Sequence, residues 1–463
     1  MQHPSTCSCS RRSFLRGCGL TLTGFGIASV FPTPLIQHAL AGVGSTNKRL
    51  LFIFLRGGND GINAVIPHGD SDYNATTRPT LYVPYAAPYD LNGFASLHPS
   101  LGSLVEPFSA GDLAIVHRVG YANNSRSHFD GQRIWENGDP TQSQLFEGWL
   151  FRYIQENALG LGADLPVLTV QATPPLLLRG DEKFVNIASP DSFAYNVTEP
   201  KRTKFKNNWR NVFANLRGLE AYRPILSQAG VKLVDTMDEY ASWDQANWNP
   251  LDPNTGWSLF PVSAATNQAG FSTSSFDFFR SIKVCALSLL ESIGSTNGTQ
   301  IAGTQLSGWD THSNQGKLTG AQPELFSWLA YGLRSLRVVL SGAATDLRNF
   351  PSIWDDTVVV TLSEFGRTTN ENGSGGTDHA AASCLFLEGG GVNGGVYNCD
   401  PSTWLHGVMY GVSGRYLLER TDYRAIFWEI LRNHMGAAAG SVDTVFPGYT
   451  AGGLGSQELG LIV

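Results

Sequence analysis

Short runs of apolar residues alternate with segments of helical periodicity, and this alternation restricts the folds that the chain can adopt. Leu50–Leu55 (LLFIFL) and Thr357–Leu362 (TVVVTL) are too short for buried helices and too uniformly apolar for strands with one solvated face. Such runs are typical of parallel strands that helices cover on both faces. We expect further strands at Leu113–Val119, Val167–Gln171 and Cys384–Leu387.

The segments between these runs favour helices. Leucines at helical spacing predict a helix over Glu324–Leu340, and apolar periodicity predicts others over Phe276–Ser292 and near Leu97–Phe108. The predicted fold class is therefore α/β, with a mostly parallel central sheet and helices on both faces. Residues 240–275 are rich in Trp, Asn, Pro and Gly, which predicts an irregular insertion within a single domain of residues 42–463.

The N-terminal residues resemble a twin-arginine export signal. Ser10–Arg16 reads S-R-R-S-F-L-R, an apolar run covers Gly19–Phe31, and Ala39-Leu40-Ala41 has the pattern of a cleavage site. This resemblance implies that residues 1–41 are a signal peptide and that the twin-arginine translocase is a partner. It also implies a periplasmic or secreted protein that is exported folded.

Composition excludes several classes of partner. The net charge of −7 argues against nucleic acids and anionic membranes, and no apolar run after Ala41 approaches the roughly 18 residues that a membrane span needs. Outside the signal, only Cys285, Cys384 and Cys399 remain, and no C-x-x-C pattern occurs. One disulfide is compatible with this count, with Cys384 and Cys399 the nearer pair.

Five polar clusters lie after or beside the predicted strands. They are RGGNDG from Arg56, NSRSHFD from Asn124, GWDTHSN from Gly308, SEFGRT from Ser363 and GTDH from Gly376. In open α/β sheets, ligands bind beyond the carboxyl ends of the strands, so we expect these clusters to meet at one edge. Their Asp, Glu and His side chains are ligands for divalent cations.

Each cluster also has an ordinary structural interpretation. GGNDG fits a tight turn, DTH and SEFGRT fit helix caps, and TDH fits a solvated loop. The chain contains no G-x-S-x-G nucleophile elbow, and Ser127 and His128 are adjacent, so a serine triad is disfavoured. The joint occurrence of the five clusters, rather than any one of them, favours a metal site.

Together these motifs resemble the domain-of-unknown-function 1501 family. The resemblance rests on GGNDG, RSHF, WDTHSNQ, SEFGRT with GTDH, and GGVY from Gly394. That family is typically exported by the twin-arginine route and is placed in the alkaline phosphatase/sulfatase superfamily. The resemblance therefore implies an alkaline-phosphatase-like fold from Leu50 to about His434, and it implies the fold more strongly than the substrate.

The superfamily also implies roles for individual residues. Its metal ligands correspond here to Asp60, Asn59, Asp310, His312, Glu364, Asp378 and His379. Ser363-Glu364 stands where the superfamily has an Asp-His pair, which leaves full two-metal occupancy open. The implied cofactors are divalent cations, zinc first, with manganese or calcium as alternatives.

The implied catalytic residues come from two of the clusters. The nucleophile that attacks phosphorus or sulfur corresponds to Ser127, or else to Ser125. His128 is a candidate leaving-group acid or further ligand, and Arg126 or Arg367 is a candidate for binding the non-bridging oxygens.

Three functions are compatible with these observations. The first is an exported metal-dependent hydrolase of phosphate or sulfate esters, acting on a small-molecule ester through a metal-activated serine. The second is a non-catalytic exported binding or assembly protein with the same fold, which the altered Ser363-Glu364 would favour. The third is a redox-cofactor protein, disfavoured because no dinucleotide glycine fingerprint and no cysteine cluster occur.

Overall fold

The computed structural model describes residues 47–141, 145–157, 166–180, 184–191, 193, 200–214, 234–293, 298–346 and 348–463. The expected signal peptide at residues 1–41 lies outside the described residues. The described residues belong to one compact unit, Thr46–Val463.

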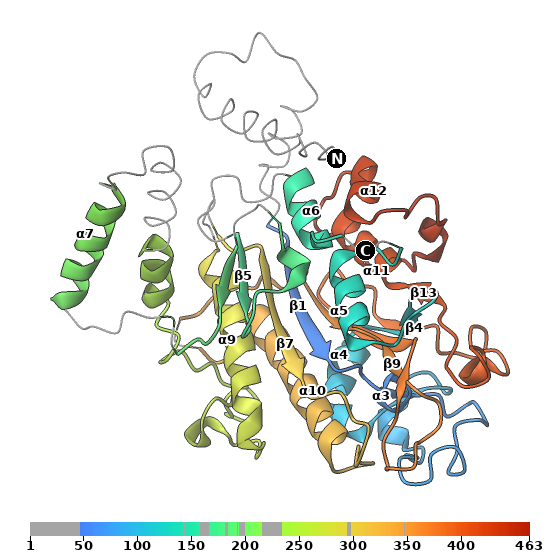
Figure 1. Cartoon of the computed structure of the whole chain (residues 1–463). Coiled ribbons are helices and arrows are strands. Elements are labelled where there is room, and N and C mark those ends of the chain that lie inside the picture. Colours follow the sequence, from blue (N-terminus) through green and yellow to red (C-terminus); the bar gives the residue numbers. More distant parts are fainter. Residues whose placement is uncertain are drawn as a thin grey trace, which may run out of the picture. The chain divides into compact units, whose positions relative to one another are not determined.

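A nine-stranded sheet forms the centre of the described structure (Figure 1). Its order is β12-β4-β11-β8-β1-β7-β5-β6, with β13 paired to β4. The strands are β1 Arg49–Arg56, β4 Leu113–Gly120, β5 Val167–Val170, β6 Val185–Ile187, β7 Ile301–Ser307, β8 Thr357–Ser363, β11 Ser383–Glu388, β12 Gly395–Tyr397 and β13 Thr421–Asp422. All pairings are parallel except those of β11, which runs antiparallel to β4 and β8. The predicted α/β class with a mostly parallel sheet is confirmed.

The uniform apolarity of β1 is explained by its central position. Leu51, Ile53 and Leu55 belong to one core cluster, which includes residues of α9 (Phe276–Glu291) and α10 (Ala321–Leu340). The alternate residues of the strand belong to a second cluster, with α5 (His128–Asn137), α6 (Trp149–Glu156) and α11 (Tyr423–Asn433). Helices thus cover both faces, as the LLFIFL run predicts.

The predicted helices are present with small shifts at their ends. Glu324–Leu340 lies within α10, and Phe276–Ser292 corresponds to α9. The helix expected near Leu97–Phe108 is divided into a 3-10 helix, Pro99–Leu104, and α4, Val105–Ala110. Other elements are α3 Gly61–Ala64, α7 Lys201–Ala214, α12 Val442–Val445 and two small two-stranded sheets, β2 Val65–Ile66 with β3 Ser96–Leu97 and β9 Gly366–Arg367 with β10 His379–Ala380.

The direction of β11 brings the fifth polar cluster to the same edge as the other four. Four clusters follow the carboxyl ends of β1, β4, β7 and β8, which are parallel to one another. GTDH precedes β11, and the amino end of an antiparallel strand lies at the carboxyl edge of its neighbours. All five clusters therefore reach one edge of the sheet.

Three further observations bear on the sequence-based expectations. Within the predicted irregular insertion of residues 240–275, residues 240–242 are helical, and from Asp244 to Ser275 the chain contains turns, bends, isolated bridges, residues without regular structure and the 3-10 helices Ala264–Thr266 and Thr273–Ser275. Cys285, Cys384 and Cys399 are buried and free, so the disulfide that their number allows does not form. Among the described residues, no helix is long and apolar enough to cross a membrane.

Candidate metal centre

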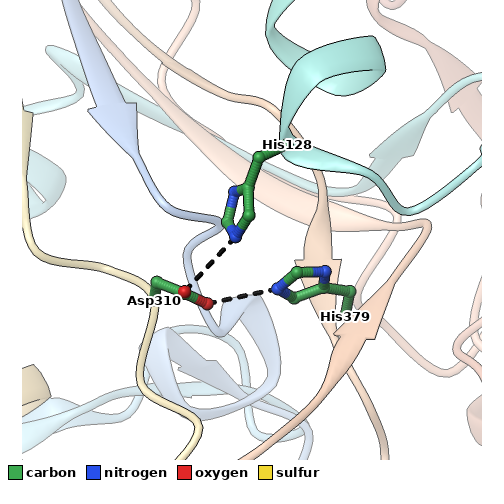
Figure 2. A group of neighbouring side chains, drawn as sticks. All are labelled: His128, Asp310 and His379. Atoms are coloured by element: carbon green, nitrogen blue, oxygen red, sulfur yellow. Dashed lines mark hydrogen bonds and ion pairs between the residues drawn. The ribbon is translucent and has the colours of Figure 1, made fainter.

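Three side chains from three different clusters meet beyond the carboxyl edge of the sheet (Figure 2). His128 is the first residue of α5, Asp310 lies in the loop after β7, and His379 begins β10. One ligand atom from each lies within 4.8 Å of the others. His128 Nε2 is 3.3 Å from Asp310 Oδ2, and His379 Nε2 is 3.1 Å from Asp310 Oδ1.

A third imidazole, that of His312, joins this group. Its Nε2 lies 3.1 Å from Asp310 Oδ1 and 2.9 Å from His379 Nε2. Asp310 and His312 are 44% and 45% exposed, so the group is open to solvent on one side. Catalytic metal centres keep such an open position, whereas structural centres are closed by protein ligands.

Each of the three imidazoles is oriented through its other ring nitrogen. His379 Nδ1 lies 2.8 Å from the backbone oxygen of Arg126, and His312 Nδ1 lies 3.2 Å from Asp378 Oδ1. His128 Nδ1 lies 2.5 Å from Glu364 Oε1. A carbonyl or carboxylate oxygen can only accept, so each Nδ1 donates, and a ring without a second proton presents a lone pair at Nε2. This is the arrangement in which histidines bind metals.

The distances from the Asp310 oxygens to the three Nε2 atoms, and the distance between Nε2 of His312 and Nε2 of His379, are compatible with a single small cation. The Nε2 atoms of His312 and His379 lie 2.9 Å apart and both lie 3.1 Å from Asp310 Oδ1, a geometry that needs either a proton or a cation between the two nitrogens. Ligand atoms about 2.0–2.1 Å from a tetrahedral zinc ion are about 3.3 Å apart. The observed separations of 2.9–3.3 Å are close to that value.

The protonation states of two of these groups agree with a ligand role. Partial burial opposes ionisation of Asp310, but the hydrogen bond from Arg367 and the positive charge of its guanidinium outweigh it and lower the pKa of this carboxyl to about 2. Burial lowers the pKa of His379, which favours its neutral form. An ionised carboxylate and neutral imidazoles are the species that coordinate a divalent cation.

Glycine at the first cluster permits the close approach of the Asp310 loop. Gly57 has φ +119°, and a Cβ there would lie 2.4 Å from the backbone nitrogen of Asp310. Gly58, at φ +86°, would place a Cβ 2.4 Å from the ring of Phe365. That ring packs against both His128 and His379, with centroid distances of 5.0 and 4.4 Å. The GGNDG motif is therefore required by packing around the centre.

Arg367 is a buried positioning residue. Its guanidinium donates to the backbone oxygens of Gly57, Gly58, Trp309 and Thr377 and, at 2.7 Å, to Asp310 Oδ1. The side chain is 0% exposed. With its donors used in this way, Arg367 holds the loops of the first, third and fifth clusters together, and its role in binding the non-bridging oxygens remains a prediction.

Asp60 and Asn59 lie in a different environment from the histidine group. The buried Asp60 carboxylate pairs with Arg78 at 2.6 Å and accepts from Gln315 Nε2 at 2.8 Å. It also caps α3 by accepting from the backbone nitrogen of Asn63. Asn59 is buried, with its Nδ2 donating to Cys384 Sγ. The structure does not bring either residue into the group around Asp310, and their role as ligands remains a prediction.

The candidate serines lie immediately before His128. Ser127 occupies the N-cap position of α5, but its side chain makes no capping hydrogen bond. Ser125 Oγ accepts from the backbone nitrogen of Ser127 at 3.3 Å. Both positions are adjacent in sequence to a proposed ligand, and the choice of nucleophile remains a prediction.

Three residues of this region were not assigned a role from the sequence. Arg78 neutralises Asp60, Gln315 links Asp60 to the loop of Thr377, and Arg415 pairs with Asp378 at 3.0 Å. Gln315 belongs to the WDTHSNQ motif, which was a usable signal. Arg78 and Arg415 lie in irregular segments where no periodicity indicates a partner.

Comparison with known proteins bears on part of this region. Residues 283–409 match the family model described as "Protein of unknown function (DUF1501)". The matched segment carries Asp310, His312, Glu364 and His379, but not His128. No curated protein and no solved structure matches the chain.

Proposed function

We propose that this chain is an exported, metal-dependent hydrolase of phosphate or sulfate esters. The observation that carries the proposal is the convergence of three Nε2 atoms on the Asp310 carboxylate, with every Nδ1 held by an acceptor. In this proposal His128, Asp310 and His379 hold one divalent cation and leave a coordination position open to the ester, with His312 beside them. A donor set of imidazoles and one carboxylate suits zinc best and manganese next, whereas calcium prefers oxygen ligands alone.

When bound, a divalent cation supplies Lewis-acid polarisation of the ester and stabilises developing negative charge. The other roles fall to the chain's own residues. Ser127 is the proposed nucleophile, with Ser125 as the alternative: its Oγ bonds to phosphorus or sulfur as the ester P–O or S–O bond breaks, and the organic group leaves as the alcohol. Water then hydrolyses the seryl ester, which releases phosphate or sulfate and restores the serine. Glu364 and Asp378 orient their histidines and are not themselves ligands in this scheme.

Arg126 is the proposed binding group for the non-bridging oxygens of the ester. Its backbone oxygen accepts from His379 Nδ1, so its backbone lies beside the centre. Its guanidinium stacks on the ring of Tyr416 at 4.6 Å and forms no ion pair with any described carboxylate. A guanidinium positioned in this way is free to donate two parallel hydrogen bonds to a phosphoryl or sulfuryl group.

The proposal is tested with purified mature protein by elemental analysis and by turnover of a panel of aryl phosphate and aryl sulfate esters. We expect about one equivalent of tightly held metal, together with turnover that a chelator abolishes. Asp310→Asn should lose both, while Asp443→Asn, a change of the same type at an exposed site on α12, should lose neither. Metal-free protein without turnover would instead favour the non-catalytic binding protein.

A further inference from the structure

A second cavity lies at the same edge of the sheet as the candidate metal centre. It has a volume of about 370 Å³ and is formed where β5, β6 and β7 end beside α9 and α10. Its lining includes Gln171, Ser274, Phe278, Ser307 and Trp328. This volume lies in the range of small-molecule sites.

Gln171 is buried in the wall of this cavity without partners for its side chain. The residue is 5% exposed, and neither Oε1 nor Nε2 makes a hydrogen bond to any described residue. Its backbone is fixed, because its nitrogen donates to Ile187 at 3.1 Å and its oxygen accepts from Asn186 at 3.0 Å. Trp328 is 7% exposed, and its indole nitrogen likewise has no hydrogen-bond partner within the described part of the chain. Buried polar groups are expensive to leave unpaired, so these groups require polar partners inside the cavity, either water or the polar groups of a ligand.

The lining also indicates the chemistry of that ligand. No lysine, arginine or histidine occurs among the described lining residues, and the one charged residue, Asp277, pairs with Arg280 at 2.6 Å. An anionic group would therefore find no counter-charge there. The amide of Gln171 both donates and accepts, and vicinal hydroxyl groups match that pattern. Phe278 and Trp328 add aromatic surface for an apolar ring face.

The cavity is close to the metal centre along the chain. Ser307, at the end of β7, lines the cavity, and Asp310 follows it in the same loop. A span of three residues separates their Cα atoms by at most about 11 Å. Arg56 connects the two regions further, because its guanidinium donates to Gln305 of β7 and to Glu136 of the helix that His128 begins. One ester could therefore place its anionic group at the centre and its organic group in the cavity.

We propose that this cavity binds a neutral, hydroxyl-rich ring, a sugar unit, as the organic part of the ester. The proposal rests on the proposed hydrolase function for its biological meaning, but the binding itself does not require metal. Gln171 and Trp328 supply the hydrogen bonds, and the anionic phosphate or sulfate stays outside the cavity.

The experiment uses metal-free protein labelled with ¹⁵N at its tryptophan indoles. The probes are neutral methyl glycosides at millimolar concentration, and Trp328→Phe identifies the Trp328 Nε1–H signal. We expect this signal to shift saturably with at least one glycoside. Gln171→Met, which keeps the volume but removes the amide, should weaken binding at least fivefold. Gln322→Met is the matched control, since Gln322 is another buried glutamine with an unpartnered oxygen and does not line the cavity.

The possible outcomes separate this proposal from the proposed function. Absence of any shift at Trp328, or equal affinity in wild type and Gln171→Met, would overturn the sugar site and leave the metal centre untouched. Saturable binding that Gln171→Met weakens and Gln322→Met preserves supports it. Because the chelated protein is used, loss of the metal hypothesis alone would not alter these readings.

Discussion

Glu364 accepts the Nδ1 hydrogen of His128 at 2.5 Å from a position that is completely buried. The same Oε1 atom accepts from the backbone nitrogen of Gly57 at 2.9 Å. This one atom therefore ties the helix that begins at His128 to the loop after β1, and it directs His128 Nε2 toward Asp310. Glu364 follows β8, so the central sheet itself fixes the orientation of a proposed ligand.

This relationship predicts different effects for two substitutions of Glu364. Glu364→Ala should lower metal affinity about 10–100-fold, because the imidazole loses the acceptor that orients it. Glu364→Gln should recover most of this loss, since an amide oxygen can still accept from His128 and Gly57. Isothermal titration with Zn²⁺ measures both. If Glu364→Gln lost as much affinity as Glu364→Ala, charge rather than orientation would be its contribution.

Replacement by asparagine should have different effects at the two aspartates: at Asp310 it should mainly change metal binding, and at Asp60 it should mainly change the free energy of unfolding. Asp310→Asn should remove bound metal and lower the free energy of unfolding by less than Asp60→Asn, because Asp310 is 44% exposed and the buried Arg367 keeps its backbone acceptors. Asp60→Asn should leave the metal ligands intact but destabilise the fold by about 3–5 kcal/mol, since it leaves the buried Arg78 unpaired. Urea unfolding and metal stoichiometry of the folded protein separate the two effects.

A second variant, Arg78→Lys, distinguishes loss of a metal ligand from loss of stability. Arg78→Lys weakens the same buried pair without altering the carboxylate. If Asp60→Asn lost its metal while Arg78→Lys kept it at similar stability, Asp60 would be a ligand and the centre would extend beyond the histidine group.

The buried carboxyl of Glu388 predicts a pH dependence of stability. Glu388 ends β11, neither of its side-chain oxygens has a partner among the described residues, and burial raises its pKa from 4.5 to about 8. The folded state therefore keeps a proton that the unfolded state releases. Stability should fall as pH rises from about 5 to 8, by up to about 1.4 kcal/mol per pH unit.

Glu388→Gln removes this titration and nearly preserves the shape. Urea unfolding at pH 5 and pH 8 should show a smaller loss of stability in the variant than in the wild type. Parallel profiles for the two proteins would mean that Glu388 ionises within the folded protein. Because Glu388 lies at the end of β11 opposite to the metal centre, metal content should not change.

The sheet and its edge were predictable from the sequence because their signals are local. Apolar runs such as Leu50–Leu55 mark buried strands wherever they occur, and polar clusters that follow parallel strands must reach one edge. The antiparallel β11 was not predicted, since a short apolar run carries no information about direction.

The role of each residue within the site was not predictable, because it depends on contacts between residues that are distant in sequence. Nothing near Glu364 in sequence indicates that its carboxylate would lie behind His128, 236 positions away. Nothing near Asp60 indicates that Arg78 would occupy both its oxygens, because the intervening segment is largely irregular. Residue types and their common edge follow from pattern, whereas individual roles follow from tertiary contacts.

Arg126 provides the last prediction, which concerns anion binding rather than metal. Its backbone is held at φ +57° by Asn124, whose Oδ1 accepts from the Arg126 nitrogen at 2.7 Å. Arg126→Ala should weaken the binding of inorganic phosphate or sulfate to metal-loaded protein about tenfold or more, because the bidentate, charge-assisted hydrogen bonds of the guanidinium are lost. Arg126→Lys should recover part of the affinity, since it keeps the charge without the bidentate hydrogen bonds. Calorimetric titration with the two anions compares them directly, and Zn²⁺ affinity should stay constant because only the backbone oxygen of Arg126 supports His379. Unchanged anion affinity in Arg126→Ala would assign the anion site to other residues of this edge.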